Sequence, residues 1–435
     1  MRILAADFVL PISTSPIEGG AIVIDDDRIV AVGTRSDISQ KFPDVPVKDL
    51  GLAAILPGFV NTHSHLEATS MRGALDAVEH DFKLWLLKLN EIRSGLSAED
   101  IEAAATLGAS EGARAGVTCF GDIGRCGEAG LRALTNVGLR GILFQETEFS
   151  PDNATAEADL DKLKSKIDAL RLESTDLVEV GVSPHSPYTV SRRLFELIAG
   201  YASVEKLKVS VHAAESAGEE NLLRNGEGFF MQYYERVGVE WEVPHCSPVE
   251  FLDRTGILDT RPLLAHCVTV SDADIDLIAR KGGRIAHCPK SNAKFGHGHA
   301  PFKSFLDAGI AVGLGSDSVA SNNVCDLLEE SRFAALAARN RDVRTGFINA
   351  AKMLEVATLG GARALGLDEK IGTLESGKQA DLAVVSLSAL GQSPINDVEA
   401  ALVFSSNARD VVTTMVAGKV VFESGLAIGT CGSPP

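Results

Sequence analysis

The chain has 435 residues, of which 45% are hydrophobic and 23% are charged, and these fractions are normal for a soluble globular protein. Its formal net charge of −18 argues against a nucleic-acid partner or an anionic membrane, because phosphate groups would be repelled. No stretch of the sequence approaches the roughly 18 apolar residues that a membrane-spanning helix needs.

Both ends of the chain show the alternation of apolar and polar residues that is typical of β-strands. Residues 1–56 and 368–435 carry this alternation, interrupted by turn residues such as Gly418. We therefore expect a small β-sandwich domain formed by both termini. Residues 57–367 would be inserted between its two parts as a separate α/β domain.

The middle of the chain alternates short apolar runs with helical stretches. The eight apolar runs cover residues 55–60, 116–123, 140–146, 178–184, 207–213, 261–267, 283–289 and 310–317. Alternating strands and helices indicate a parallel sheet, and eight units of this kind predict a closed (β/α)8 barrel of the TIM type.

Polar side chains gather where these expected strands end, which is the face where barrel enzymes carry their active sites. His63 and His65 follow the first run, and residues two apart on extended backbone point the same way. His212 ends the fifth run and Asp317 ends the eighth, which lies beside the first in a closed barrel. Three imidazoles and a carboxylate suit one Zn²⁺ or Fe²⁺ ion with a position open for water. The alternative for the histidine pair is two loop residues that cap the next helix.

Two further residues at strand ends are candidates for the chemistry itself. Glu215 lies three residues after His212, where a carboxylate can move protons between water and substrate; an ordinary acidic residue in the first turn of a helix is the alternative. His266 ends the sixth run and is expected to orient the attacking water or stabilise a developing oxyanion; the alternative is a core histidine bonded to a backbone carbonyl.

Other histidines and aromatic residues leave more than one interpretation open. His185 is expected to face the substrate, whereas His287 fits either the site or the core. His297 and His299 flank a glycine and are predicted to lie in a solvated loop. The aromatic residues between 229 and 241 could form a lid over the site, but packing of a helix against its neighbour is the preferred interpretation.

Five motifs occur along the chain in the same order as in a known protein family. They are PGFVNTHSH (57–65), VHAAE (211–215), LLAHC (263–267), HCPKSN (287–292) and GLGSDS (313–318). The chain resembles the amidohydrolase superfamily, in its cytosine-deaminase-like and chlorohydrolase-like branch, and within it the adenosine-type deaminases. The resemblance implies hydrolytic deamination at C6 of an adenine ring, with Glu215 shuttling one proton and Asp317 accepting a second. Binuclear relatives carry a carboxylated Lys at the end of strand four, which is missing here, so one metal ion is expected.

The resemblance also bears on the substrate. Enzymes acting on S-adenosylhomocysteine and methylthioadenosine carry Glu before the Trp that matches Trp85, where this chain has Leu84, and they place Arg after strand three. Glu67, directly after the metal motif, favours enzymes that act on aminodeoxyfutalosine in menaquinone synthesis. The expected substrate-binding residues are His185, Glu67, Trp85 and Arg125, the last meeting a carboxylate unless it is a solvated loop residue.

Several alternatives and general expectations complete the prediction. The alternative functions are a deaminase of guanine or another base, a triazine-type chlorohydrolase and, remotely, a scaffold without catalysis. Seven cysteines without a CxxC pair fit a reducing cytoplasm. The resemblance implies a homodimer acting on a small molecule. The net charge and the lack of a long apolar stretch predict that it has no nucleic-acid or membrane partner.

Overall fold

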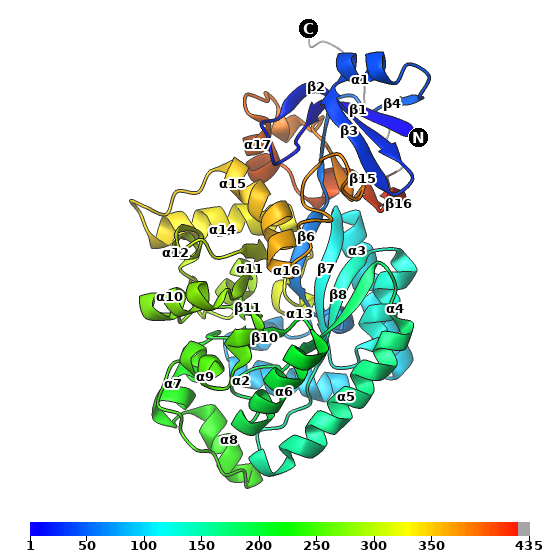
Figure 1. The fold of residues 1–435 in the computed structure, drawn as a ribbon. Helices are drawn as coiled ribbons and strands as arrows, with labels where there is room; N and C mark the ends of the chain where they lie inside the picture. The colour runs from blue at the N-terminus through cyan, green and yellow to red at the C-terminus, as the bar shows by residue number, and fades with distance from the viewer. Residues whose placement is uncertain (425–435) are drawn as a thin grey trace.

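The computed structural model describes residues 1–424, and strands from both ends of the chain form one sheet at the top of Figure 1. Its hydrogen-bonded order is β16-β15-β14-β5-β1-β2-β3, with β4 paired to β1. The strands are β1 (Arg2–Val9), β2 (Ile17–Asp25), β3 (Arg28–Thr34), β4 (Val47–Asp49), β5 (Ala53–Pro57), β14 (Leu382–Ser386), β15 (Val411–Val416) and β16 (Lys419–Glu423). Because β5 pairs with β14, the N-terminal and C-terminal parts meet within the sheet and share a buried cluster that includes Ile22, Ile55 and Val384.

Eight parallel strands form the barrel. They are β6 (Phe59–Ser64), β7 (Val117–Gly124), β8 (Arg140–Glu146), β9 (Val178–Ser183), β10 (Ser210–Ala213), β11 (Leu263–His266), β12 (Arg284–His287) and β13 (Val312–Leu314). The first four and the last four each pair in chain order. Parallel bridges from Val182 to Val209 and from Ser64 to Asp317 join the two groups on both sides, which closes the ring. The predicted (β/α)8 barrel is therefore confirmed.

Most helices surround the barrel, whereas α1 packs against β2 and β3 of the terminal sheet, and Figure 1 places α7, α8 and α9 at the end opposite that sheet. The helices are α1 (Arg35–Lys41), α2 (Phe82–Ser94), α3 (Ala98–Arg114), α4 (Glu128–Val137), α5 (Ala156–Glu173), α6 (Arg192–Glu205), α7 (Ala217–Asn225), α8 (Phe229–Val237), α9 (Pro248–Arg254), α10 (Asp272–Lys281), α11 (Pro289–Lys294), α12 (Phe302–Asp307), α13 (Val319–Asn322), α14 (Leu327–Arg341), α15 (Ala350–Glu355), α16 (Gly361–Leu365) and α17 (Val398–Ala400). Their starts follow sequence signals: Ser97 and Ser271 each form a capping box with an aspartate three residues on, which satisfies backbone N–H groups in the first turn.

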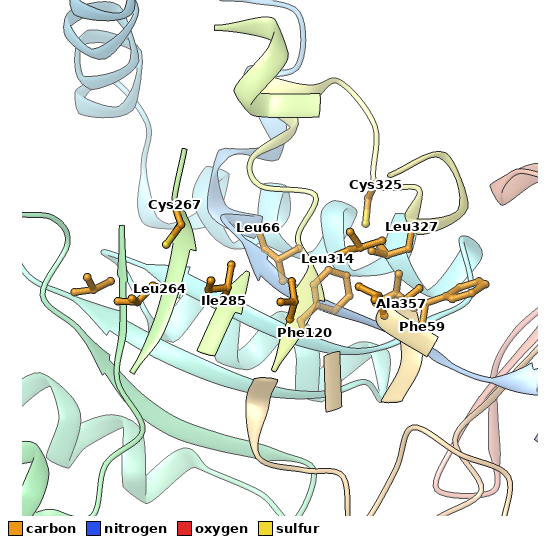
Figure 2. Packing of buried hydrophobic residues seen from close by; sticks show 14 of the residues in the cluster. Phe59, Leu66, Phe120, Leu264, Cys267, Ile285, Leu314, Cys325, Leu327 and Ala357 are labelled. Carbon is orange, nitrogen blue, oxygen red and sulfur yellow. The ribbon is translucent and has the colours of Figure 1, made fainter. Parts of the chain in front are cut away.

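Two apolar layers hold the barrel together. Figure 2 shows the outer layer, in which Leu264 and Ile285, paired across β11 and β12, belong to the large cluster shared by the strands and the surrounding helices. Residues of strands on opposite sides of the ring, such as Cys119 and Ala265, share a second cluster with α16. That cluster fills the barrel interior, so the barrel is a packed core rather than a pore.

The first barrel strand differs from the prediction. The apolar run 55–60 is divided between β5 and β6, because Gly58 lies between them and donates its N–H to the carbonyl of Asp381. A Cβ at Gly58 would also overlap the side chain of Thr118. His63 therefore lies inside β6 rather than after the strand, and Asp317 lies beyond the end of β13. The domain boundaries at 56/57 and 367/368 stay predictions.

Two general features complete the description of residues 1–424. None of the helices in this range combines the length and the apolar character needed to cross a membrane. The six cysteines in this range are free thiols, whereas Cys431 lies outside the described residues.

Candidate metal centre and active site

The side chains of His63, His65, His212 and Asp317 converge from β6, β10 and the turn after β13. The Nε2 atoms of His65 and His212 lie 3.2 Å apart. Oδ1 of Asp317 lies 3.3 Å from Nε2 of His63 and 3.6 Å from Nε2 of His65. Four potential ligand atoms from distant parts of the sequence thus surround one point.

The protonation state of these groups fits a divalent cation. Burial lowers the pKa of His63 to about 3 and that of His212 to about 4, so both imidazoles are neutral at pH 7. Burial alone would raise the pKa of Asp317, but the neighbouring imidazoles, His63 foremost, hold it well below its ordinary value. Neutral imidazoles and an ionised carboxylate are the forms that coordinate metals.

Orientation of the imidazoles supports the same conclusion. Nδ1 of His65 contacts the carbonyl of Ile123 at 3.1 Å, and Nδ1 of His212 contacts that of His185 at 2.9 Å. These contacts place the proton on Nδ1 and leave Nε2 with a free lone pair that faces the common point. Among the described residues 1–424, both ring nitrogens of His63 are buried without a hydrogen-bond partner, a costly arrangement that a coordinated ion would relieve. The donor set therefore fits one divalent metal ion, and three imidazoles with a carboxylate suit Zn²⁺.

The backbone turns sharply where the strands deliver these side chains. Ala214, His266 and Asp317 adopt positive φ angles of 50°, 73° and 57°. Non-glycine residues in this region carry strain and concentrate at functional sites. At Asp317 the turn is fixed by Ser291 and Ser321, whose hydroxyls donate to Oδ2 at 2.6 Å and 2.9 Å. Oδ1 is thereby left facing the histidines.

Glu215 and His266 lie next to these candidate metal ligands. Oε1 of Glu215 is 3.8 Å from Nε2 of His266, and Nδ1 of His266 donates to Oδ1 of Asn292 at 2.9 Å. That donation fixes the ring with Nε2 directed toward Glu215. The backbone N–H groups of Ala214 and Glu215 donate to the buried carboxylate of Glu219, which fixes the turn carrying Glu215.

A cavity of about 360 Å³ opens above these groups, within the size range of small-molecule sites. His65, His212, Glu215, His266 and Asp317 contribute to its lining. Its walls carry aromatic side chains, namely Phe82, Trp85, Phe149, Tyr188, Phe229, Phe230, Tyr233 and Phe295. The polar side chains on one side of this cavity and the aromatic rings on its other walls suit a flat heterocyclic ligand.

All four expected substrate-binding residues line this cavity, but they differ in their free hydrogen-bonding capacity. The indole N–H of Trp85 is buried and has no partner in the part of the chain that the structure describes, so it can donate to a ligand. Both oxygens of Glu67 accept backbone N–H groups, from Arg125 and Cys126, and the carboxylate also pairs with Arg93.

Arg125 and His185 share an acidic neighbour. Nε of Arg125 lies 3.6 Å from Glu146 and 3.8 Å from Glu148, so its charge is already balanced. Nε2 of His185 lies 3.7 Å from Glu146, and its Nδ1 contacts the hydroxyls of Ser186 and Thr189.

The remaining histidines and aromatic residues resolve the interpretations left open above. His297 does not lie in a solvated loop, because its side chain is 7% exposed and its Nε2 is 3.8 Å from Oε1 of Glu215. His287 is buried and stacks on Phe302 at 4.7 Å, which favours a structural position. In the aromatic segment Tyr233 lines the cavity, whereas Trp241 packs against Tyr234.

Sequence reasoning missed two side chains near the reacting groups, Tyr188 and Asn292. The hydroxyl of Tyr188 donates to Oε2 of Glu215 at 2.9 Å, and Asn292 fixes His266 as described above. Tyr188 lies in the segment SPHSPY (183–188) and Asn292 in the motif HCPKSN (287–292). These segments indicated that both residues lie near the site, but their spacing did not show that the two side chains contact Glu215 and His266.

Comparisons with known proteins agree with this geometry. The sequence profile of the amidohydrolase family matches residues 54–421. A 5-methylthioadenosine/S-adenosylhomocysteine deaminase of Moorella thermoacetica is 34% identical over 426 residues, which cover 96% of this chain and 93% of that protein.

Solved structures share the fold. The crystal structure of a zinc-bound adenosine deaminase from Xanthomonas campestris superposes with a TM-score of 0.85 and 28% identity, covering 97% of this chain and 93% of that one. The aminofutalosine deaminase of Helicobacter pylori, in complex with methylthio-coformycin, shares the fold with a TM-score of 0.80 and 22% identity, covering 97% and 100%. The expected resemblance is confirmed: the chain belongs to the amidohydrolase family and is a hydrolase that acts on carbon–nitrogen bonds.

Proposed function

We propose that this protein deaminates an adenine nucleoside by hydrolysis at C6. The observation that carries the proposal is the placement of Glu215 and His266 beside four converging metal-ligand candidates, at one side of an aromatic-walled cavity. The relatives named as deaminases of methylthioadenosine and adenosine point to the same substrate class.

The chain's own residues divide the reaction between them. A divalent ion held by His63, His65, His212 and Asp317 would polarise a water molecule and lower its pKa. Glu215 takes a proton from this water and delivers it to ring N1, which makes C6 more electrophilic. His266 orients the water through its free Nε2.

Proton transfers then complete the exchange of nitrogen for oxygen. The water oxygen forms a bond to C6, and the bond from C6 to the amino nitrogen breaks. The second proton of the water passes through Asp317 to that nitrogen, which leaves as ammonia. The ring retains the first proton on N1, so atoms and charge balance.

Within this class our finer proposal for the substrate is 6-amino-6-deoxyfutalosine, an intermediate of menaquinone synthesis, and zinc is the proposed ion. Support comes from Leu84 before Trp85 and from the end of β8 and the segment that follows it, which carry Glu146 and Glu148 and contain no arginine. Phe149 and Tyr233, with ring centroids 5.5 Å apart, offer apolar surface to an aromatic 5′ group. Arg125 is already paired with acidic side chains and is therefore not free to bind a carboxylate of the substrate. Nucleosides whose 5′ group carries no carboxylate must for this reason be tested beside aminodeoxyfutalosine.

Ammonia release tests the proposal directly. Metal-loaded protein is assayed with aminodeoxyfutalosine, methylthioadenosine, S-adenosylhomocysteine, 5′-deoxyadenosine and adenosine, with the Glu215→Gln variant as the matched control. The proposal is supported if wild type deaminates at least one nucleoside and the Glu215→Gln variant deaminates none. The nucleoside with the highest kcat/KM is then the preferred substrate.

Guanine and a chlorinated triazine serve as the competing substrates. Release of ammonia from guanine, or of chloride from the triazine, without turnover of any nucleoside would refute the proposal. Inactivity on every compound by protein carrying its metal would favour a non-catalytic scaffold. A homodimer and a cytoplasmic location stay predictions from the sequence.

A further inference from the structure

Glu215 is contacted differently at its two carboxylate oxygens. Oε2 accepts a hydrogen bond of 2.9 Å from the hydroxyl of Tyr188. Tyr188 is 1% exposed, its ring stacks on Phe230 at 4.5 Å, and its own carbonyl accepts a hydrogen bond from Tyr234. This tyrosine is therefore held rigidly on one side of the proton-transfer group.

His297 faces the other oxygen. Its Nε2 lies 3.8 Å from Oε1 of Glu215, at the same distance from that atom as Nε2 of His266. Within residues 1–424 this nitrogen is buried and has no hydrogen-bond partner. A buried polar nitrogen without a partner is unfavourable, and contacts of active sites without ligand are commonly longer than they become with substrate bound. Glu215 is thus the acceptor toward which His297 is placed.

The ring of His297 is fixed by aromatic neighbours from the cavity wall. It meets Phe82 edge to face at 4.8 Å and lies 5.2 Å from Phe295. Phe82 begins α2, and both phenylalanines line the cavity, whereas His297 stands behind them. A ligand that contacts Phe82 and Phe295 is therefore in indirect contact with His297 through these two rings.

From this geometry we propose that His297 is a positioning residue for Glu215. It holds Oε1 while Tyr188 holds Oε2, so that the carboxylate keeps one orientation while it takes a proton from water and gives it to the substrate. His297 also transmits contact between substrate and the α2 wall to the proton-transfer group. The kinetic part of this inference rests on the proposed deaminase function.

A pair of substitutions tests the role in catalysis. His297→Ala is expected to lower kcat about 10- to 100-fold, because a small displacement of a reacting group has effects of this size, while KM changes less than about threefold. His297→Gln keeps an N–H donor near the place of Nε2 and is expected to restore kcat to within about fivefold of wild type. His299→Ala, two residues away in the same loop, is the matched control and should leave kcat unchanged.

The effect must also depend on Glu215. In a Glu215→Gln background, adding His297→Ala is expected to change the residual kcat less than about twofold, because residues that act through one another are not additive. Melting temperature and metal content accompany each variant. A kcat for His297→Ala within twofold of wild type, or a full effect in the Glu215→Gln background, would overturn the inference.

A second measurement does not require turnover. In metal-loaded protein labelled with ¹⁵N, the imidazole resonances of His297 are expected to shift on Glu215→Gln, whereas those of His299 stay in place. An unchanged His297 spectrum would overturn the inference for any substrate and even if His297→Ala does not fold. Absence of deamination by wild type would instead remove the proposed function, so the two failures are distinguishable.

Discussion

Replacing Glu330 with glutamine is expected to remove a pH-dependent loss of stability. Glu330 lies in α14, and its side chain is fully buried. Oε1 accepts a 2.6 Å hydrogen bond from Asn322, whose amide also donates to the carbonyl of Ser316. Glu330 thus anchors the turn that carries Asp317, and a glutamine keeps the same acceptor.

The magnitude follows from the pKa of Glu330. Burial raises this pKa from 4.5 to about 8 although Lys290 opposes the shift. Between these two values the folded protein keeps the proton that the unfolded chain has lost, so wild-type stability falls as pH rises. The slope is about 1.4 kcal/mol per pH unit, which gives an upper limit of about 4 kcal/mol between pH 5 and pH 8. For a chain of 435 residues this corresponds to a shift in melting temperature of roughly 4 °C.

Calorimetric melting of wild type and Glu330→Gln between pH 5 and pH 9 measures the effect. The melting temperature of the variant minus that of wild type should rise by about 2–4 °C from pH 5 to pH 8 and then level off. Glu329→Gln is the control, because the side chain of this neighbour is 43% exposed and pairs with the same lysine. A difference that stays constant over this range would refute the assignment of a raised pKa to Glu330.

Three further predictions concern the site. His212→Ala should lower bound divalent metal to well below one ion per chain, because one of four ligands is lost; elemental analysis that finds a full complement would contradict the ligand assignment. Glu215→Gln should keep its metal yet lose at least about 100-fold in kcat, and near-normal turnover would exclude it as the proton shuttle. Tyr233→Ala should raise KM severalfold, because Tyr233 lines the cavity, whereas Trp241→Ala should not, since Trp241 packs on Tyr234; equal KM values for both variants would show that the wall does not bind substrate.

Periodicity predicted the barrel, and the barrel in turn predicted which side chains meet. His63, His212 and Asp317 are far apart in the sequence, but parallel strands bring their carboxyl ends to one face. This rule was sufficient to expect their convergence. It was not sufficient to locate the start of β6, because the division at Gly58 depends on a hydrogen bond to the distant Asp381.

Residues in loops were harder to predict. His297 stands between glycines in a polar segment, and only the packing of Phe82 and Phe295 against it explains its burial. Likewise, the pairing of Glu67 with Arg93 depends on how α2 lies over the barrel, which no local pattern encodes. Tertiary contacts of this kind decide side-chain roles that strand and helix signals leave open.

The bridge between Ser64 and Asp317, together with the hydrogen bond from the Asp317 N–H to the carbonyl of His63, has a consequence for biosynthesis. The same few atoms close the ring of strands and bring the carboxylate to the imidazoles, so the complete set of four candidate ligands cannot form before Asp317 has been synthesised. While the ribosome still holds β13, His63 and His65 lack their acidic partner. Selection of the ion is thereby deferred until nearly three quarters of the polypeptide has been synthesised.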